Sequence, residues 1–103
     1  MPNEVQNIIE RIIGLINPVK IIMFGSYSNN SQNKDSDLDL LIITDTQEPR
    51  YKSASNLRMQ LYPYSLPLDL LVYTPTEYEK WKNTKNHILY NIENYGLTVY
   101  ERQ

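Results

Sequence analysis

Three acidic residues and a glycine–serine pair are the residues of this sequence best suited to chemistry. Asp37 and Asp39 follow Gly25-Ser26 after ten intervening residues. In an extended strand, residues two apart point to the same face, so these carboxylates lie roughly 6–7 Å apart at the Cα level. Carboxylates that close repel each other, and a hard divalent cation such as Mg²⁺ removes the repulsion by binding both. The acidic pair therefore predicts a metal site.

A third carboxylate, Asp69, lies within an apolar segment, residues 66–72, where burial without a partner is costly. If this segment forms a strand beside that of Asp37 and Asp39, the three carboxylates can surround two metal ions. Such sites suit in-line phosphoryl or nucleotidyl transfer, because one ion activates the attacking oxygen and the other stabilises the leaving pyrophosphate. The alternative is that Asp69 is an edge or strand-end residue paired with Lys or Arg.

Gly25-Ser26 ends an apolar segment, residues 19–24. A glycine lets a phosphate approach the backbone closely, and the start of a short helix with the Ser26 hydroxyl supplies donors for anionic oxygens. The pair therefore predicts a phosphate-binding turn. The alternative is that Ser26 is an ordinary turn serine.

Hydrophobic patterning predicts the elements that position these residues. The predicted strands are 19–24, 37–44, 66–73 and a short edge strand at 97–100. The predicted helices are 4–16, capped by Asn3, a short one after Ser26, 51–62, 75–82 and 86–95. This order predicts a small α/β (α+β) domain with a mixed sheet and helices packed mainly on one face.

Two of these helices carry more specific expectations. Thr74-Pro75-Thr76-Glu77 has the pattern of a capping box with proline at the first helical position. In the last helix, the periodicity predicts that Ile88, Leu89 and Ile92 face inward.

Composition limits the classes of function. The 103 residues, 41% of them hydrophobic, predict a single globular domain over 1–103. A net charge of −2 argues against nucleic-acid binding through a broad basic surface. The absence of cysteine excludes disulfides and thiolate sites. His87 is the only histidine, so a His-rich metal site is excluded. No apolar run approaches a membrane span and no secretory signal is visible, so we expect a cytoplasmic protein.

Together these motifs resemble the nucleotidyltransferases of the DNA polymerase beta superfamily, and most closely the minimal nucleotidyltransferases (MNT). The resemblance rests on Gly25-Ser26, Asp37-Leu38-Asp39, residues 68–72 and the ending 92–101. It implies a mixed-sheet nucleotidyltransferase fold, two Mg²⁺ ions and a nucleoside triphosphate, often ATP. It assigns triphosphate binding to Gly25 and Ser26, and metal binding and catalysis to Asp37, Asp39 and Asp69. Asp69 would help to activate the acceptor hydroxyl.

The resemblance also implies a partner. Family members of this length commonly pair with a small helical HEPN protein in toxin–antitoxin systems, and the MNT protein attaches AMP to a tyrosine of that partner. We therefore expect AMP transfer from ATP to a hydroxyl, with a HEPN-type tyrosine as the acceptor and homo- or hetero-oligomers both open.

One departure from the family pattern keeps an alternative open. Many relatives have a small residue, a basic or aromatic residue and a glycine where this chain has Ser28, Asn29 and Asn30. Asparagine tolerates positive φ, so the turn can survive. The missing basic residue favours the alternative of a catalytically weak MNT-fold module that neutralises its partner by contact. A nucleic-acid-binding role is disfavoured by the net charge.

Overall fold

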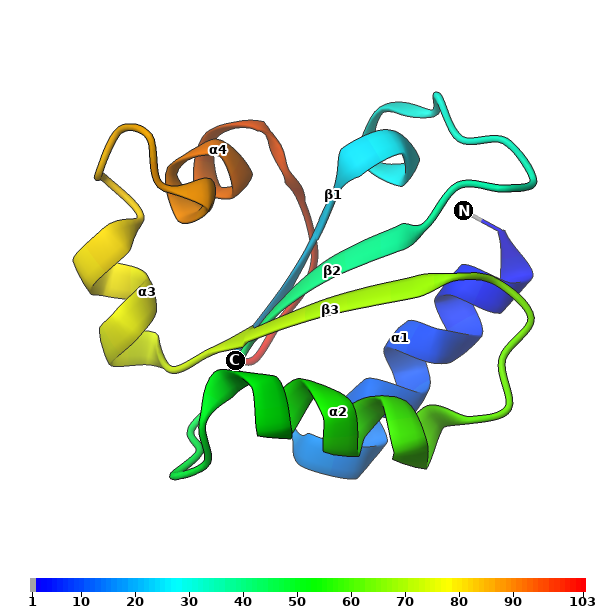
Figure 1. The fold of residues 1–103 in the computed structure, drawn as a ribbon, viewed down its shortest axis with the longest axis horizontal. Coiled ribbons are helices and arrows are strands. Elements are labelled where there is room, and N and C mark those ends of the chain that lie inside the picture. Colours follow the sequence, from blue (N-terminus) through cyan, green and yellow to red (C-terminus); the bar gives the residue numbers. More distant parts are fainter. Residues whose placement is uncertain (1) are drawn as a thin grey trace.

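A mixed four-stranded sheet with strand order β3-β2-β1-β4 forms the centre of the computed structural model, which describes residues 2–103 (Figure 1). The strands are β1 (Lys20–Phe24), β2 (Leu38–Ile43), β3 (Leu68–Tyr73) and β4 (Leu97–Glu101). The helices are α1 (Asn3–Ile16), the 3₁₀ helix η1 (Gly25–Asn29), α2 (Arg50–Leu61), α3 (Pro75–Trp81) and α4 (Ile88–Tyr95). The predicted order of elements and the mixed sheet are confirmed.

Strand pairing brings distant parts of the chain together at one end of the sheet. β1 runs antiparallel to β2 and to β4, whereas β2 and β3 are parallel. A parallel pair needs a crossover connection, and α2 supplies it. Because β1 and β2 are antiparallel, the end of β1 meets the start of β2, with Phe24 opposite Asp39. In the parallel pair Asp39 lies opposite Asp69.

The helices divide between the two faces of the sheet, so the prediction that they pack mainly on one face is wrong. The longer helices α1 and α2 share one face, and the shorter α3 and α4 lie on the other (Figure 1). Alternating strand residues therefore feed two cores. The first core, against α1 and α2, includes Ile8, Ile12, Ile21, Leu40, Ile42, Leu57 and Leu61. The second, against α3 and α4, includes Ile22, Leu41, Ile43, Tyr73, Tyr78, Leu89 and Ile92.

Two local predictions are wrong. The first helix begins at Asn3 and has Pro2 at its N-cap, with no side-chain cap. The Pro2 carbonyl instead accepts the Gln6 N–H at 3.1 Å, and the fixed φ of proline favours this start. Ile88, expected to face inward, is 46% exposed, whereas Leu89 and Ile92 are buried. Ile88 is the first residue of α4, so its side chain lies at the rim of the second core.

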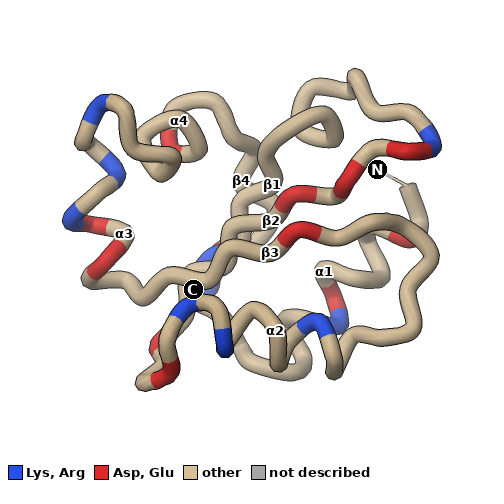
Figure 2. Tube along the Cα trace, in the orientation of Figure 1, with Lys and Arg blue, Asp and Glu red and all other residues tan. Residues whose placement is uncertain are grey.

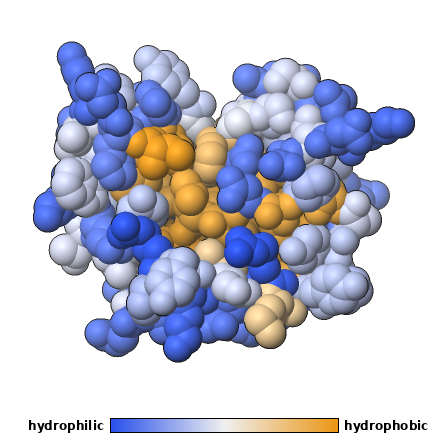
Figure 3. All heavy atoms as spheres, viewed as in Figure 1, coloured by the Kyte–Doolittle hydropathy of each residue, from blue (hydrophilic) through white to orange (hydrophobic). Residues whose placement is uncertain are grey.

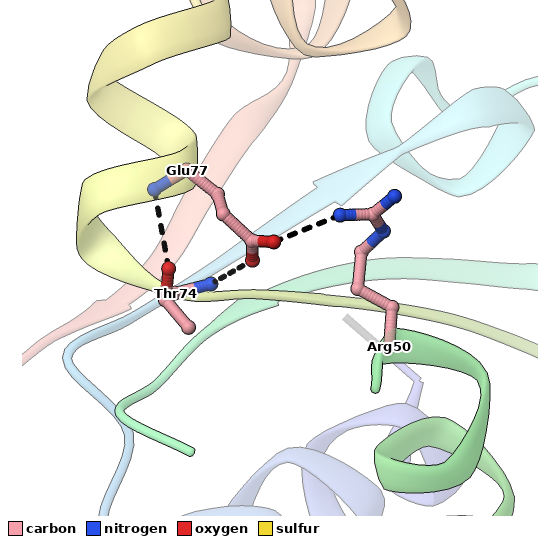
Figure 4. A network of polar contacts seen from close by, with 3 residues as sticks. All are labelled: Arg50, Thr74 and Glu77. Carbon is pink, nitrogen blue, oxygen red and sulfur yellow. Dashed lines mark hydrogen bonds and ion pairs between the residues drawn. The ribbon is translucent and has the colours of Figure 1, made fainter. Parts of the chain in front are cut away.

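A polar network fixes the far end of the sheet, where β2 and β3 finish (Figure 4). The predicted capping box is present: the Glu77 N–H donates to Thr74 Oγ1 at 3.1 Å, and the Thr74 N–H donates to Glu77 Oε1 at 2.9 Å. The other oxygen of Glu77 accepts from Arg50 Nη1 at 2.9 Å. Since Arg50 begins α2, the network joins the start of the crossover helix to the start of α3.

No helix among residues 2–103 is long and apolar enough to cross a membrane.

Candidate active site

Asp39 and Asp69 form the centre of the site. They are register partners on adjacent parallel strands, so their side chains project from the same face. Partial burial, together with the charges of Asp69 and then Asp37, raises the pKa of Asp39 to about 6. A hydrogen bond between the Asp39 and Asp69 carboxyls acts in the same direction by favouring the protonated form. The chain thus holds two carboxyl groups side by side on one face of the sheet.

Asp37 lies just outside this pair. It precedes β2, which begins at Leu38, and its side chain is exposed. The Leu38 N–H donates to the Pro67 carbonyl at 2.8 Å, so the segments that lead into β2 and β3 are tied together at this end. The structure therefore brings Asp39 and Asp69 into contact, and it leaves Asp37 within electrostatic reach of Asp39.

The donor chemistry of this cluster fits a hard divalent cation. Within residues 2–103, no three Asp, Glu, His or Cys side chains form a preformed metal cage. Mg²⁺ does not require one, because it binds through one or two carboxylates and takes its other ligands from water and substrate phosphates. Burial and the neighbouring carboxylates both raise the Asp39 pKa, and a cation between Asp39 and Asp69 would relieve the repulsion from the neighbouring charge.

Among residues 2–103, no basic side chain forms an ion pair with these carboxylates. The ion pairs in the part of the chain that the structure describes are Arg50–Glu77 and Lys82–Glu79, and neither includes an aspartate. Figure 2 shows the acidic positions of β2 and β3 side by side, without a basic position between them. The alternative of an edge residue paired with Lys or Arg is therefore only half met, because Asp69 lies on the edge strand β3 but has no such partner.

Gly25 is needed at its position for two reasons. Its φ is +75°, a left-handed conformation that other residues adopt at a cost. A Cβ added to Gly25 would also collide with Asp39 Oδ2. The backbone of Gly25 thus lies directly against Asp39, as a phosphate-binding turn beside a metal site would require.

The turn that follows Gly25 is closed by polar contacts within the chain. Asn30 ends η1 with φ of 61°, and its N–H donates to the Ser26 carbonyl. An asparagine therefore takes the left-handed position in this turn, as the sequence indicated. The neighbouring Asn29 accepts a hydrogen bond from Ser31 Oγ at 2.6 Å through its Oδ1. Asn29 stabilises the turn and provides no positive charge.

Residues from α4 also border the site, and sequence reasoning missed them. Leu97 pairs with Met23, so the residues just before β4 lie beside those just after β1. As a result Asn91 and Tyr95 share a cavity of about 260 Å³ with Gly25. Figure 3 shows a hollow with an apolar floor between the α3–α4 side and the η1 side of the molecule. The only signal in the sequence for this contribution was a tyrosine directly before a glycine, Tyr95-Gly96, and this signal is weak.

A larger cavity, of about 670 Å³, lies near the Arg50–Glu77 pair at the opposite end of β2 and β3. It does not include the acidic pair or Gly25. Its basic group Arg50 is held by Glu77, and Glu48 adds a further negative charge. This cavity therefore lacks the features of the candidate active site.

Comparison with known proteins agrees with this geometry. Residues 3–100 match the family model of the nucleotidyltransferase domain. A Methanocaldococcus jannaschii protein named as a candidate protein adenylyltransferase is 32% identical over 80 residues, which cover 78% of this chain and 77% of that protein. The crystal structure of a toxin–antitoxin with AMP-PNP superimposes with a TM-score of 0.60 at 23% identity, covering 99% of this chain and 76% of that one. This last likeness confirms the fold.

Proposed function

Because this chain belongs to the nucleotidyltransferase domain family, we propose that it transfers AMP from ATP to a hydroxyl group. The observation that carries the proposal is the pairing of Asp39 with Asp69 on adjacent strands, with the backbone of Gly25 directly against Asp39. A phosphate-binding turn beside paired carboxylates is the arrangement that nucleotidyl transfer needs. In this proposal residues 1–103 act as one minimal nucleotidyltransferase domain.

The site residues take the roles that this chemistry requires. Gly25 and Ser26 bind the triphosphate, since the glycine lets a phosphate oxygen approach the backbone. Asp37, Asp39 and Asp69 hold the divalent cations, for which we propose two Mg²⁺ ions. When bound, the ions neutralise the triphosphate and the pyrophosphate that leaves.

The reaction forms one bond and breaks one. The acceptor oxygen attacks the α-phosphorus of ATP, and the bond from that phosphorus to the oxygen bridging to the β-phosphate breaks. Pyrophosphate leaves with the bonding electrons, and the acceptor keeps AMP as a phosphodiester. We assign the hydroxyl proton to the carboxylate of Asp69, which is more exposed than Asp39 and so more accessible to an acceptor.

For the acceptor, we propose a tyrosine hydroxyl of a HEPN-type helical protein in the cytoplasm, which this chain would silence as an antitoxin. Two similarities support a protein acceptor: one relative is named for protein adenylylation, and one structural neighbour is a toxin–antitoxin. β3 is an edge strand, so an acceptor can reach Asp69 from outside the sheet.

A labelling assay tests the proposal. The purified protein is incubated with α-labelled ATP, Mg²⁺ and a lysate of the source cell. We expect one labelled band that disappears with EDTA and in Asp37→Asn/Asp39→Asn, whose side chains keep the size of the originals. Asp35→Asn is the matched control, because Asp35 is an exposed aspartate of the same loop. Equal labelling by the double variant and by wild type would refute the proposal.

One observation favours a second function. The turn after Gly25 contains Asn29 and Asn30 and no basic residue, which weakens the grip on a triphosphate. The second candidate is therefore a binding module that neutralises its partner by contact. It predicts that Asp39→Asn still binds the partner and still protects cells. Loss of protection by a stably folded Asp39→Asn would exclude it.

A further inference from the structure

We propose that the cavity between α4 and η1 binds the base of the nucleoside triphosphate, with Tyr95 as the stacking surface and Asn91 as the group that favours adenine. This inference rests on the proposed function, because it assumes that the phosphates bind at Gly25-Ser26. Nothing in the family comparisons assigns a role to α4.

The position of the cavity is the first argument. Gly25 lines it and also contacts Asp39, so one residue borders both the acidic pair and the cavity. A ligand whose phosphates lie on Gly25 can therefore extend into the cavity on the side away from the carboxylates. The volume of about 260 Å³ is below the roughly 300–1,000 Å³ typical of whole-ligand sites, which suits one part of a ligand.

The chemistry of the walls is the second argument. Tyr95 is 77% exposed and Ile88 is 46% exposed, so α4 presents an aromatic ring and an aliphatic side chain to solvent beside Gly25. Phe24 also lines the cavity. Large exposed apolar side chains that line a concave surface indicate a ligand site. A planar base stacks well on such an aromatic ring.

The polar groups at the rim are the third argument. Asn91 is exposed and lines the cavity, so its amide is available to a ligand. An asparagine amide can donate and accept at once, which matches the N6 and N7 edge of adenine. Guanine presents two acceptors at the equivalent edge, so Asn91 would favour adenine. Asn29 Oδ1 already accepts a hydrogen bond from Ser31 Oγ, so Asn29 can interact with a ligand through its amide NH₂.

Calorimetry with two ligands tests the inference. The probes are the ATP analogue with a methylene group between the α- and β-phosphates, which resists transfer, and inorganic tripolyphosphate, which has no base. With Mg²⁺ present, we expect Tyr95→Ala to weaken the analogue about tenfold and to leave tripolyphosphate unchanged. Tyr95→Phe should restore binding of the analogue. Asn91→Ala should reduce the preference for the ATP analogue over its GTP counterpart.

The control is Tyr51→Ala, which removes an equally exposed tyrosine from α2 and should change neither affinity. If Tyr95→Ala leaves the affinity of the analogue unchanged while tripolyphosphate still binds, the inference is overturned and the proposed function stands. Equal weakening of both probes also overturns it, because that result indicates a general structural effect. If neither probe binds wild type, the proposed function fails and the inference fails with it.

Discussion

Replacing Asp39 by asparagine should stabilise the metal-free protein while it removes activity. The reason is that the pKa of Asp39 is raised from 3.8 to about 6 by burial and by the charges of Asp69 and Asp37. The folded state therefore binds the Asp39 proton more tightly than the unfolded state does. As the pH rises through the window from about 4 to 6, the free energy of unfolding falls, because the folded state must give up that proton.

The size of the effect follows from the shift. A shift of about 2 units corresponds to a ceiling of about 3 kcal/mol at pH 8. Asp39 is only partly buried, so screening by water reduces this value, and we expect about 1 kcal/mol. For a domain of this size, that is about 4 °C or more in Tm. Asparagine also keeps a donor for the hydrogen bond to Asp69, so the variant resembles the protonated wild type.

Urea denaturation in EDTA at pH 8 and at pH 4 measures this difference. Asp39→Asn should be more stable than wild type at pH 8, and the difference should shrink toward zero at pH 4. Asp35→Asn, in the exposed loop, should match wild type at both pH values. If the Asp39→Asn variant is no more stable than wild type at pH 8, or gains the same amount at both pH values, the carboxylates do not repel each other as described.

Three further changes test other parts of the structure. Saturating Mg²⁺ should raise the Tm of wild type by several degrees in a thermal scan, and that of Asp39→Asn much less. A ligand that binds only the folded state stabilises it by about 2.7 kcal/mol at a hundredfold excess over Kd. Equal shifts for the two proteins would count against cation binding at Asp39. Gly25→Ala should lower stability by about 1–2 kcal/mol in urea denaturation and abolish labelling, since the new methyl group collides with Asp39 Oδ2 and the residue keeps a positive φ. An active Gly25→Ala would contradict the close approach of the Gly25 backbone to Asp39. Glu77→Ala should lower the free energy of unfolding by about 1–2 kcal/mol and Arg50→Gln by less than about 1 kcal/mol, because only the first removes the capping box as well as the exposed ion pair. The reverse order in urea denaturation would show that the cap contributes little to stability.

Much of the site could be predicted from the sequence because its signals are local. Gly25 follows an apolar strand, and the i, i+2 spacing of Asp37 and Asp39 depends only on the strand period. The pairing of Asp39 with Asp69 required one assumption, that the two strands are neighbours, and the fold confirms it. The roles of these residues stay predictions until activity is measured.

The contribution of α4 could not be predicted, because it depends on contacts between distant parts of the chain. Tyr95 reaches Gly25 only because β4 pairs with β1, and no local pattern specifies that pairing. The outward position of Ile88 depends on where α4 begins. His87 caps that helix through Nδ1, which accepts the Leu89 N–H at 3.1 Å, and its ring stacks on Trp81 at 5.0 Å. Helix periodicity alone does not indicate the starting residue.

The alternation of side chains along β3 links the packing of the core to the position of Asp69. Leu70 and Val72 point into the core against α1 and α2, whereas Asp69 points to the opposite face. A slip of β3 by one residue would exchange the two faces, placing the Asp69 carboxylate on the face of the first core and mismatching the side chains of both cores. A chain slipped by one residue would therefore be less stable, and its Asp69 would no longer lie opposite Asp39. Correct packing of β3 in the two cores therefore favours the register in which Asp69 lies opposite Asp39.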